Sequence, residues 1–173
     1  MDQLSGSKRG FTIVELLIVI VVIAILAAIT IVAYNGIQNQ AKNAQVVSGV
    51  NAYVKGVLSY YSLKNTVPMS GGSIQCFDGT SCWSGMDATA TATLRTNLRE
   101  VMSALPTFPA NHAVLVTSAS TSDSVNGGTY TGWYVLYQVV GTNTCPGISG
   151  LRYLNGGNTS DNLRNCRAAL ELP

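Results

Sequence analysis

The strongest constraint on this chain is an almost unbroken apolar run close to its amino terminus. Residues 16–29 read LLIVIVVIAILAAI, and the wider window of residues 11–33 is interrupted only by Thr12, Glu15 and Thr30. As a helix that rises about 1.5 Å per residue, this window extends about 35 Å, which exceeds the roughly 30 Å hydrocarbon core of a bilayer. The run therefore predicts a membrane-spanning helix.

Two positive residues, Lys8 and Arg9, precede the run. Positive charge favours the cytoplasmic side of a membrane, so we expect the first ten residues inside and everything after Ala33 outside. A secretory signal peptide is the alternative, with a shorter apolar core of roughly 7 to 15 residues before a small-residue cleavage site. Ala24, Ala27 and Ala28 offer such a site, but the longer run and the helical pattern beyond it favour a retained span.

Glu15 places a carboxylate near the start of this span. An acidic side chain costs roughly 2.5 to 3.5 kcal/mol near the centre of a membrane helix, and less near its end. One interpretation is that Glu15 lies at the interface and reaches water. The other is that a positive group neutralises it in a helix bundle, either from another chain or from a newly made amino terminus.

The sequence Lys8-Arg9-Gly10, followed by FTIVELL and the aliphatic run, resembles the class III signal of type IV prepilins and the related pseudopilins. The resemblance is strong over about residues 8–35. The rest of the chain resembles the family only in the order of its parts, a long helix followed by a globular domain. It implies that a membrane-embedded prepilin peptidase cuts between Gly10 and Phe11, then methylates the new amino group of Phe11. It also implies that Glu15 pairs with the ammonium of a neighbouring subunit.

The resemblance implies further partners: other copies of the subunit in a homo-polymer, a membrane platform protein, an assembly ATPase that acts indirectly, and the lipid bilayer before assembly. Nucleic acid binding stays open. Fibres of this kind serve adhesion, motility or secretion. Cleavage would leave one ammonium four residues from one carboxylate, so staggered helices can compensate both charges in an apolar interior. Packing of aliphatic side chains would supply most of the adhesion.

No proline occurs between Phe11 and Pro68, so we expect the helix to continue to about Leu63. Glycines at residues 36, 49 and 56 each weaken a helix by roughly 1 kcal/mol relative to alanine. Apolar residues at helical spacing predict a stripe that packs on a sheet from the same chain. The stripe comprises Ile37, Ala41, Ala44, Val47, Val50, Val54, Val57, Leu58 and Tyr61.

The remainder predicts a short helix and a few strands. Asp87 is a good N-cap for a helix to about Ala104, which Pro106 ends. Strands are expected at residues 113–117 and 130–140, joined by the polar stretch 118–129, with a shorter strand near residues 151–154. These elements predict an antiparallel sheet of three or four strands on the long helix, an α+β class that the resemblance identifies with the type IV pilin fold.

Four cysteines occur, Cys76, Cys82, Cys145 and Cys166, and their spacing lacks the paired knuckles of a zinc site. The extracytoplasmic placement favours disulfides, for which three connectivities exist. Cys76 with Cys82 and Cys145 with Cys166 is preferred, because sequential closure needs the least rearrangement. The resemblance also implies a carboxy-terminal loop closed by a disulfide. In the loop-entropy model, closing the larger of the two loops stabilises the fold by about 3 kcal/mol.

No catalytic, cofactor or metal site emerges from the polar residues. The chain has ten Lys and Arg residues and eight Asp and Glu residues, and these charges are scattered along it. No stretch is basic enough to predict a nucleic-acid-binding groove. His112 is the only histidine, and no G-x-S-x-G nucleophile elbow is present. The aspartates are dispersed and lack the spacing of a calcium loop. We therefore expect a protein that is not an enzyme.

The sequence is thus divided into a leader at residues 1–10, a transmembrane and assembly helix at 11–33, an amphipathic stem at 34–65 and a globular domain at 66–173. The favoured function is a structural subunit of a type IV pilus or pilus-like fibre. One alternative is a pseudopilin of a type II secretion or DNA-uptake system. Another is a single-span anchored enzyme or binding domain, for which Glu15 would be incidental.

Overall fold

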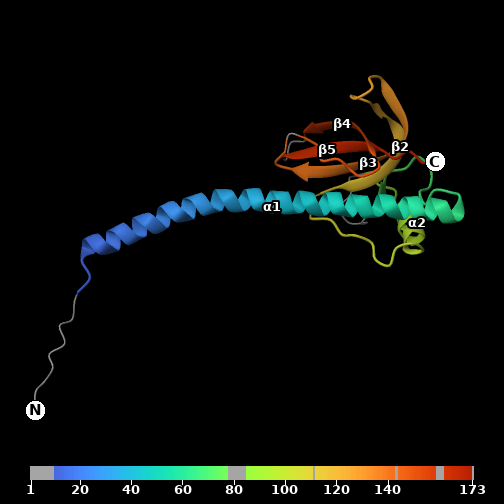
Figure 1. Cartoon of the computed structure of the whole chain (residues 1–173). Coiled ribbons are helices and arrows are strands. Elements are labelled where there is room, and N and C mark those ends of the chain that lie inside the picture. Colours follow the sequence, from blue (N-terminus) through green and yellow to red (C-terminus); the bar gives the residue numbers. More distant parts are fainter. Residues whose placement is uncertain (1–9, 78–84, 111, 143, 159–161, 173) are drawn as a thin grey trace, which may run out of the picture. The chain divides into compact units, whose positions relative to one another are not determined.

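The computed structural model describes residues 10–77, 85–110, 112–142, 144–158 and 162–172. The chain separates into two compact units, Met1–Gln38 and Asn39–Pro173. The first unit holds the amino-terminal part of a long helix, α1, and the second holds its remainder together with the sheet and the short helix α2 (Figure 1).

Helix α1 spans Ile13–Lys64, which confirms the predicted continuous helix. Its end has a local cause. Asn65 adopts the left-handed conformation with φ of 53°, and its amide nitrogen donates to the carbonyl oxygen of Tyr61 at 2.8 Å. Asparagine tolerates this conformation and satisfies a carbonyl that the helix leaves open, which is how many helices stop.

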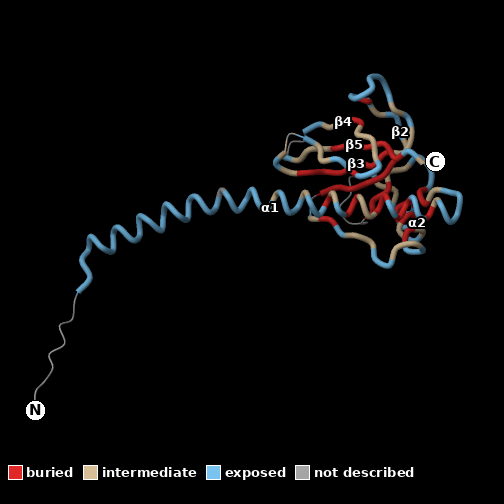
Figure 2. Tube along the Cα trace, viewed as in Figure 1, coloured by how far each residue is buried: buried red, intermediate tan, exposed pale blue. Residues whose placement is uncertain are grey.

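In the second unit, one face of α1 is buried (Figure 2). Val50, Val54 and Val57 lie in the core as predicted, but the stripe as a whole is rotated, because Ala41, Ala44 and Leu58 are exposed. The buried face instead follows residues at alternating spacings of three and four along the helix. The residues that replace them are Val46, Tyr53 and Tyr60.

Two glycines of α1 have a packing role that propensity alone does not reveal. A Cβ at Gly49 would overlap the ring of Phe108, and a Cβ at Gly56 would overlap the Sδ atom of Met102. Both neighbours come from the segment after α2. The glycines therefore let this segment approach the helix backbone closely, which offsets their cost in helix propensity.

The sheet has five strands in the order β1-β2-β3-β5-β4, and every neighbouring pair is antiparallel. Figure 1 labels β2, β3, β4 and β5 of this sheet. The strands are β1 Gln75–Cys76, β2 Val114–Ser122, β3 Thr129–Val140, β4 Arg152–Asn158 and β5 Leu163–Ala169. The α+β class with a long helix packed on a small antiparallel sheet is confirmed, and it matches the pilin fold expected from the resemblance.

The strand predictions need four corrections. The sheet has five strands rather than three or four. β2 runs five residues past the predicted end, because its Ser and Thr residues pair with β3 as far as Ser122 opposite Thr129. β5 was missed since Arg164, Asn165 and Arg167 break the alternation of apolar and polar residues, and β4 extends four residues beyond the predicted 151–154 because it pairs with β5.

The two faces of the sheet carry different cores, as the alternation of strand side chains requires. Side chains such as Val116 and Tyr137 face α1 and join the main core. Their neighbours Leu115 and Leu136 point to the other face and form a smaller cluster with Leu154. Both faces of the central strands are therefore buried.

Helix α2 spans Ala88–Arg99, and Asp87 caps it as predicted by accepting the amide hydrogen of Ala90 at 2.8 Å. The helix ends five residues before the predicted Ala104. The amides of Glu100 and Val101 bond three residues back, to the carbonyl oxygens of Asn97 at 3.2 Å and of Leu98 at 3.1 Å, so the last turn tightens and the chain leaves the helix. Leucines of α2 nevertheless fill the core.

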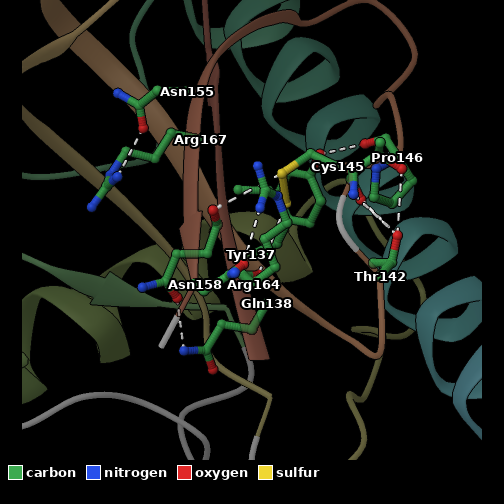
Figure 3. Close-up of a disulfide and its surroundings, with 12 residues drawn as sticks. Tyr137, Gln138, Thr142, Cys145, Pro146, Asn155, Asn158, Arg164 and Arg167 are labelled. Carbon is green, nitrogen blue, oxygen red and sulfur yellow. Dashed lines mark hydrogen bonds between the residues drawn. A yellow bond between two sulfur atoms is a disulfide. The ribbon is translucent and has the colours of Figure 1, made fainter. Parts of the chain in front are cut away.

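A disulfide joins Cys145 to Cys166 with an S–S distance of 2.01 Å (Figure 3). This is the preferred pairing for the larger loop. Beside it, the Tyr137 hydroxyl donates to the carbonyl oxygen of Pro146. Cys82 lies outside the described residues, so its pairing with Cys76 stays a prediction.

Candidate functional site: the amino-terminal signal segment

The expected cleavage point lies just outside α1. Gly10 and Phe11 are exposed and belong to no helix or strand, whereas the helix begins at Ile13. A Cβ at Gly10 would meet no atom within 4 Å. The Gly10–Phe11 peptide bond is therefore open to an approaching protein, as a proteolytic site requires.

Thr12 and Glu15 cap the start of α1 reciprocally. The Thr12 backbone amide donates to Oε2 of Glu15 at 2.9 Å, and the Thr12 hydroxyl donates to the same oxygen at 2.7 Å. In return the Glu15 amide donates to Oγ1 of Thr12 at 3.2 Å. This arrangement is a capping box, which satisfies two amides that a helix start otherwise leaves without partners.

Sequence reasoning missed the role of Thr12, which it counted only as an interruption of the apolar run. The sequence did contain the pattern that predicts this role, because Thr12 and Glu15 have the T-x-x-E spacing of a capping box directly before an apolar helix. The two explanations that the sequence suggested for Glu15 were contact with water and a positive group in a helix bundle, and neither involved a partner in the same helical turn. The structure adds a partner within the same turn.

The two bonds from Thr12 reach the same carboxylate oxygen, Oε2. Among the described residues, no hydrogen bond or ion pair is made to Oε1 of Glu15. An ionised carboxylate offers about four acceptor positions. Glu15 therefore keeps acceptor capacity for a positive group from another chain while its capping bonds stay in place.

Thr30, the third polar residue of the run, donates its hydroxyl to the carbonyl oxygen of Ala27 at 2.9 Å. Thr12, Glu15 and Thr30 thus each have a hydrogen-bond partner three residues away in the chain. The large apolar side chains around them whose exposure the structure describes are, by contrast, about half exposed or more, from 48% at Val21 to 86% at Ile13. Figure 2 shows this part of the helix as exposed. Helix α1 is long and apolar enough to cross a membrane, where internal satisfaction of polar groups is needed.

A match to the family described as prokaryotic N-terminal methylation motif covers residues 6–31. The chain carries a type IV prepilin-like class III signal. This prepilin-like signal includes Gly10, Phe11 and Glu15, and it confirms the resemblance. No curated protein and no solved structure matches the chain.

The prepilin-like signal implies processing by a prepilin peptidase and assembly of the pilin type in general. It indicates a structural, pilin-like protein, and together with the apolar helix it fits membrane anchoring. The roles of Gly10, Phe11 and Glu15 individually stay predictions, since the match covers a segment and does not test single residues.

The polar residues in the rest of the described chain bear on two other kinds of site, metal and catalytic. Over the described ranges, no group of three or more His, Cys, Asp and Glu side chains is placed to hold a metal ion. His112 is 4% exposed, and its Nδ1 lies 3.1 Å from the carbonyl oxygen of Ala110. It is a buried histidine bonded to its own loop.

Proposed function

We propose that this chain is the precursor of a type IV pilin-like subunit that polymerises into an extracytoplasmic fibre. The observation that carries the proposal is the prepilin-like signal at residues 6–31, which includes the amino-terminal part of α1, where the large apolar side chains are exposed from Ile13 to Ile31. Such a helix needs lipid around it before assembly and similar helices around it afterwards.

In this proposal, residues 1–10 form a leader that a prepilin peptidase removes by cutting the Gly10–Phe11 bond. The same enzyme methylates the new amino group of Phe11, which keeps its positive charge. The open position of Gly10 before the helix start supports this assignment. Cleavage also removes Lys8 and Arg9, which otherwise hold the helix end at the cytoplasmic surface.

Assembly then brings the ammonium of one Phe11 to Glu15 of a neighbouring subunit. The free Oε1 of Glu15 supports this pairing, because the carboxylate can accept the ammonium without losing its bonds to Thr12. In an apolar interior either charge alone is costly, whereas the pair compensates both. Charge pairing would set the stagger, and aliphatic packing would supply most of the adhesion.

The second unit is placed outside the cytoplasmic membrane in this proposal, with a single span and the amino terminus inside. The Cys145–Cys166 disulfide supports that location, because disulfides persist in oxidising compartments. The proposed partners are the peptidase, further copies of the chain, a platform protein with its ATPase, and the bilayer that stores the subunit before assembly. The chain itself is proposed to act without catalysis.

The mass of the mature protein is the first test. The proposal expects residues 11–173 plus one methyl group, less four hydrogens for two disulfides. Two variants then separate the steps: Gly10→Val should accumulate as full-length precursor, and Glu15→Gln should be cleaved but should assemble poorly. An anchored enzyme would tolerate both changes, and a protein that still begins at Met1 in cells with an active peptidase would refute the proposal.

Fibre length separates the two kinds of pilus-like polymer. Electron microscopy of cells that express the chain should show long surface fibres for a pilus, and only shorter fibres for a pseudopilus of secretion or DNA uptake. Glu15→Gln is the matched control, because it should remove both kinds of fibre.

A further inference from the structure

The turn between β2 and β3 is a distinct feature that the proposed function does not use. It reads DSVNGG over residues 123–128, and Asn126 and Gly127 at its tip are exposed. Gly127 adopts the left-handed region with φ of 75°, and a Cβ there would meet no atom within 4 Å. Nothing described therefore shields the peptide bond between Asn126 and Gly127.

An asparagine followed by glycine is chemically the weakest kind of asparagine linkage. The glycine nitrogen can attack the side-chain amide carbon, because no Cβ on the glycine obstructs the approach. A bond forms between Gly127 N and Asn126 Cγ, the bond from Cγ to Nδ2 breaks, and ammonia leaves with the proton of the glycine amide. Water then opens the five-membered ring to aspartate or isoaspartate, so the net reaction consumes one water and releases one ammonia.

We propose that Asn126 is a site of spontaneous deamidation in the folded chain. The reaction needs water alone as co-reactant, and the exposed turn supplies it. Asparagine is among the thermolabile residues for this reason. The site is independent of the signal segment, so it holds whether or not the chain forms a fibre.

The same chain contains two other Asn–Gly pairs, and the fold protects both. Asn155 is 8% exposed, and its amide nitrogen donates to Oγ1 of Thr121 at 3.2 Å and to Oγ of Ser122 at 3.0 Å. Gly156 is paired in the sheet, and a Cβ there would come within 2.8 Å of the Sγ of Cys145. The Asn155 side chain is therefore held away from ring closure.

The third pair, Asn35–Gly36, lies inside α1. Helical dihedral angles keep the nitrogen of the following residue away from the side-chain carbonyl, so ring closure would require the helix to open. Among the three pairs only the one at the hairpin tip combines exposure with a turn conformation.

Conversion of Asn126 would alter the turn locally. Its Nδ2 now donates to Oδ2 of Asp123 at 3.3 Å, and its backbone amide donates to Oδ1 of the same residue at 3.0 Å. A carboxylate in place of the amide removes one donor and puts a like charge beside Asp123. Asp123 also binds Arg152 at 2.5 Å, so the new charge competes for the cation that joins the turn to β4.

The test uses the full-length chain in detergent micelles, incubated at neutral pH in water enriched in heavy oxygen, which labels each new carboxylate. Peptide mass spectrometry then reads the label at all three asparagines. We expect at least about tenfold more label at Asn126 than at Asn155, since tenfold protection needs only about 1.4 kcal/mol of local opening. A denatured, reduced sample should gain label at all three.

Asn126→Gln is the matched variant, because it keeps the amide donor while the larger ring that it would require forms slowly. It should abolish the acidic isoform that isoelectric focusing of the aged wild-type chain reveals. The proposal is overturned if the folded chain gains label at Asn126 no faster than at Asn155 while the denatured chain gains it at all three. It is also overturned if Asn126→Gln leaves the acidic isoform unchanged.

Discussion

Thr12 and Glu15 bond each other in both directions across the first turn of α1, with the hydroxyl of one 2.7 Å from the carboxylate of the other and the amide of Glu15 3.2 Å from Oγ1 of Thr12. The carboxylate that we propose for subunit pairing is thus also the residue that starts the helix. Its orientation is set before any second chain arrives. Pairing between subunits then adds a bond to an oriented group and spares the cost of ordering it.

Replacement of Thr12 tests this capping box. Thr12→Val keeps the shape of the side chain but removes the hydroxyl, so the helix start should lose about 1 kcal/mol. The Glu15 amide should then exchange its hydrogen about fivefold faster, as that free energy implies. Hydrogen exchange of the full chain in micelles measures this. Thr12→Ser keeps the hydroxyl and should behave as wild type, and equal rates in all three proteins would contradict the cap.

Gly49→Ala tests the close approach of Phe108 to α1. The added Cβ would overlap the buried ring, so overpacking should cost about 1 to 3 kcal/mol and exceed the gain of about 0.5 to 1 kcal/mol in helix propensity. Urea unfolding followed by tyrosine fluorescence measures the loss. Phe108→Leu in the same chain should recover part of it. Gly36→Ala is the control, because a Cβ there meets no atom within 4 Å and should not destabilise the fold.

Removal of the Cys145–Cys166 disulfide should destabilise the second unit. Its sequence separation of 21 residues corresponds to about 3 kcal/mol in the loop-entropy account. The double variant Cys145→Ser with Cys166→Ser should therefore unfold at a lower urea concentration than wild type. A midpoint that does not move, in a sample whose wild-type disulfide is verified by mass, would show that the bond adds nothing to stability.

Asp123 makes the stability of the β2–β3 turn depend on pH. Hydrogen bonds from the Asn126 backbone amide and from the Arg152 guanidinium lower the pKa of Asp123 from its ordinary 3.8 to about 2. Because the folded pKa is the lower one, the stabilisation is present above pH 3.8 and is lost as the pH falls through about 2. The urea midpoint of Asp123→Asn should lie below that of wild type at neutral pH, and the difference should vanish at acid pH. A difference that is independent of pH would exclude the carboxylate as its cause.

Sequence reasoning succeeded where the cause of a structure lies within a few residues. The apolar run, the Asp87 cap and the continuous helix were all predicted, because each depends on neighbouring side chains and on the absence of proline. The capping box at Thr12 was equally local and was overlooked only because Glu15 was considered without its neighbours.

Errors arose where partners come from distant parts of the chain. β5 has a polar sequence, and it is a strand because β3 and β4 pair with it on either side. The buried face of α1 was misplaced by about one position, because the sheet and the segment after α2 decide which side chains are covered. From helix propensity alone, Gly49 was expected only to weaken α1, whereas the structure shows that it makes room for the ring of Phe108.

The sequence by itself determined the membrane-capable helix, its start and the prepilin-like signal, since these follow from hydrophobicity and spacing along the chain. Only the tertiary structure decided the strand order, the pairing of Cys145 with Cys166 and the different environments of the three Asn–Gly pairs. The physical reason is that burial and pairing depend on which residues meet in space. Local pattern does not contain that information.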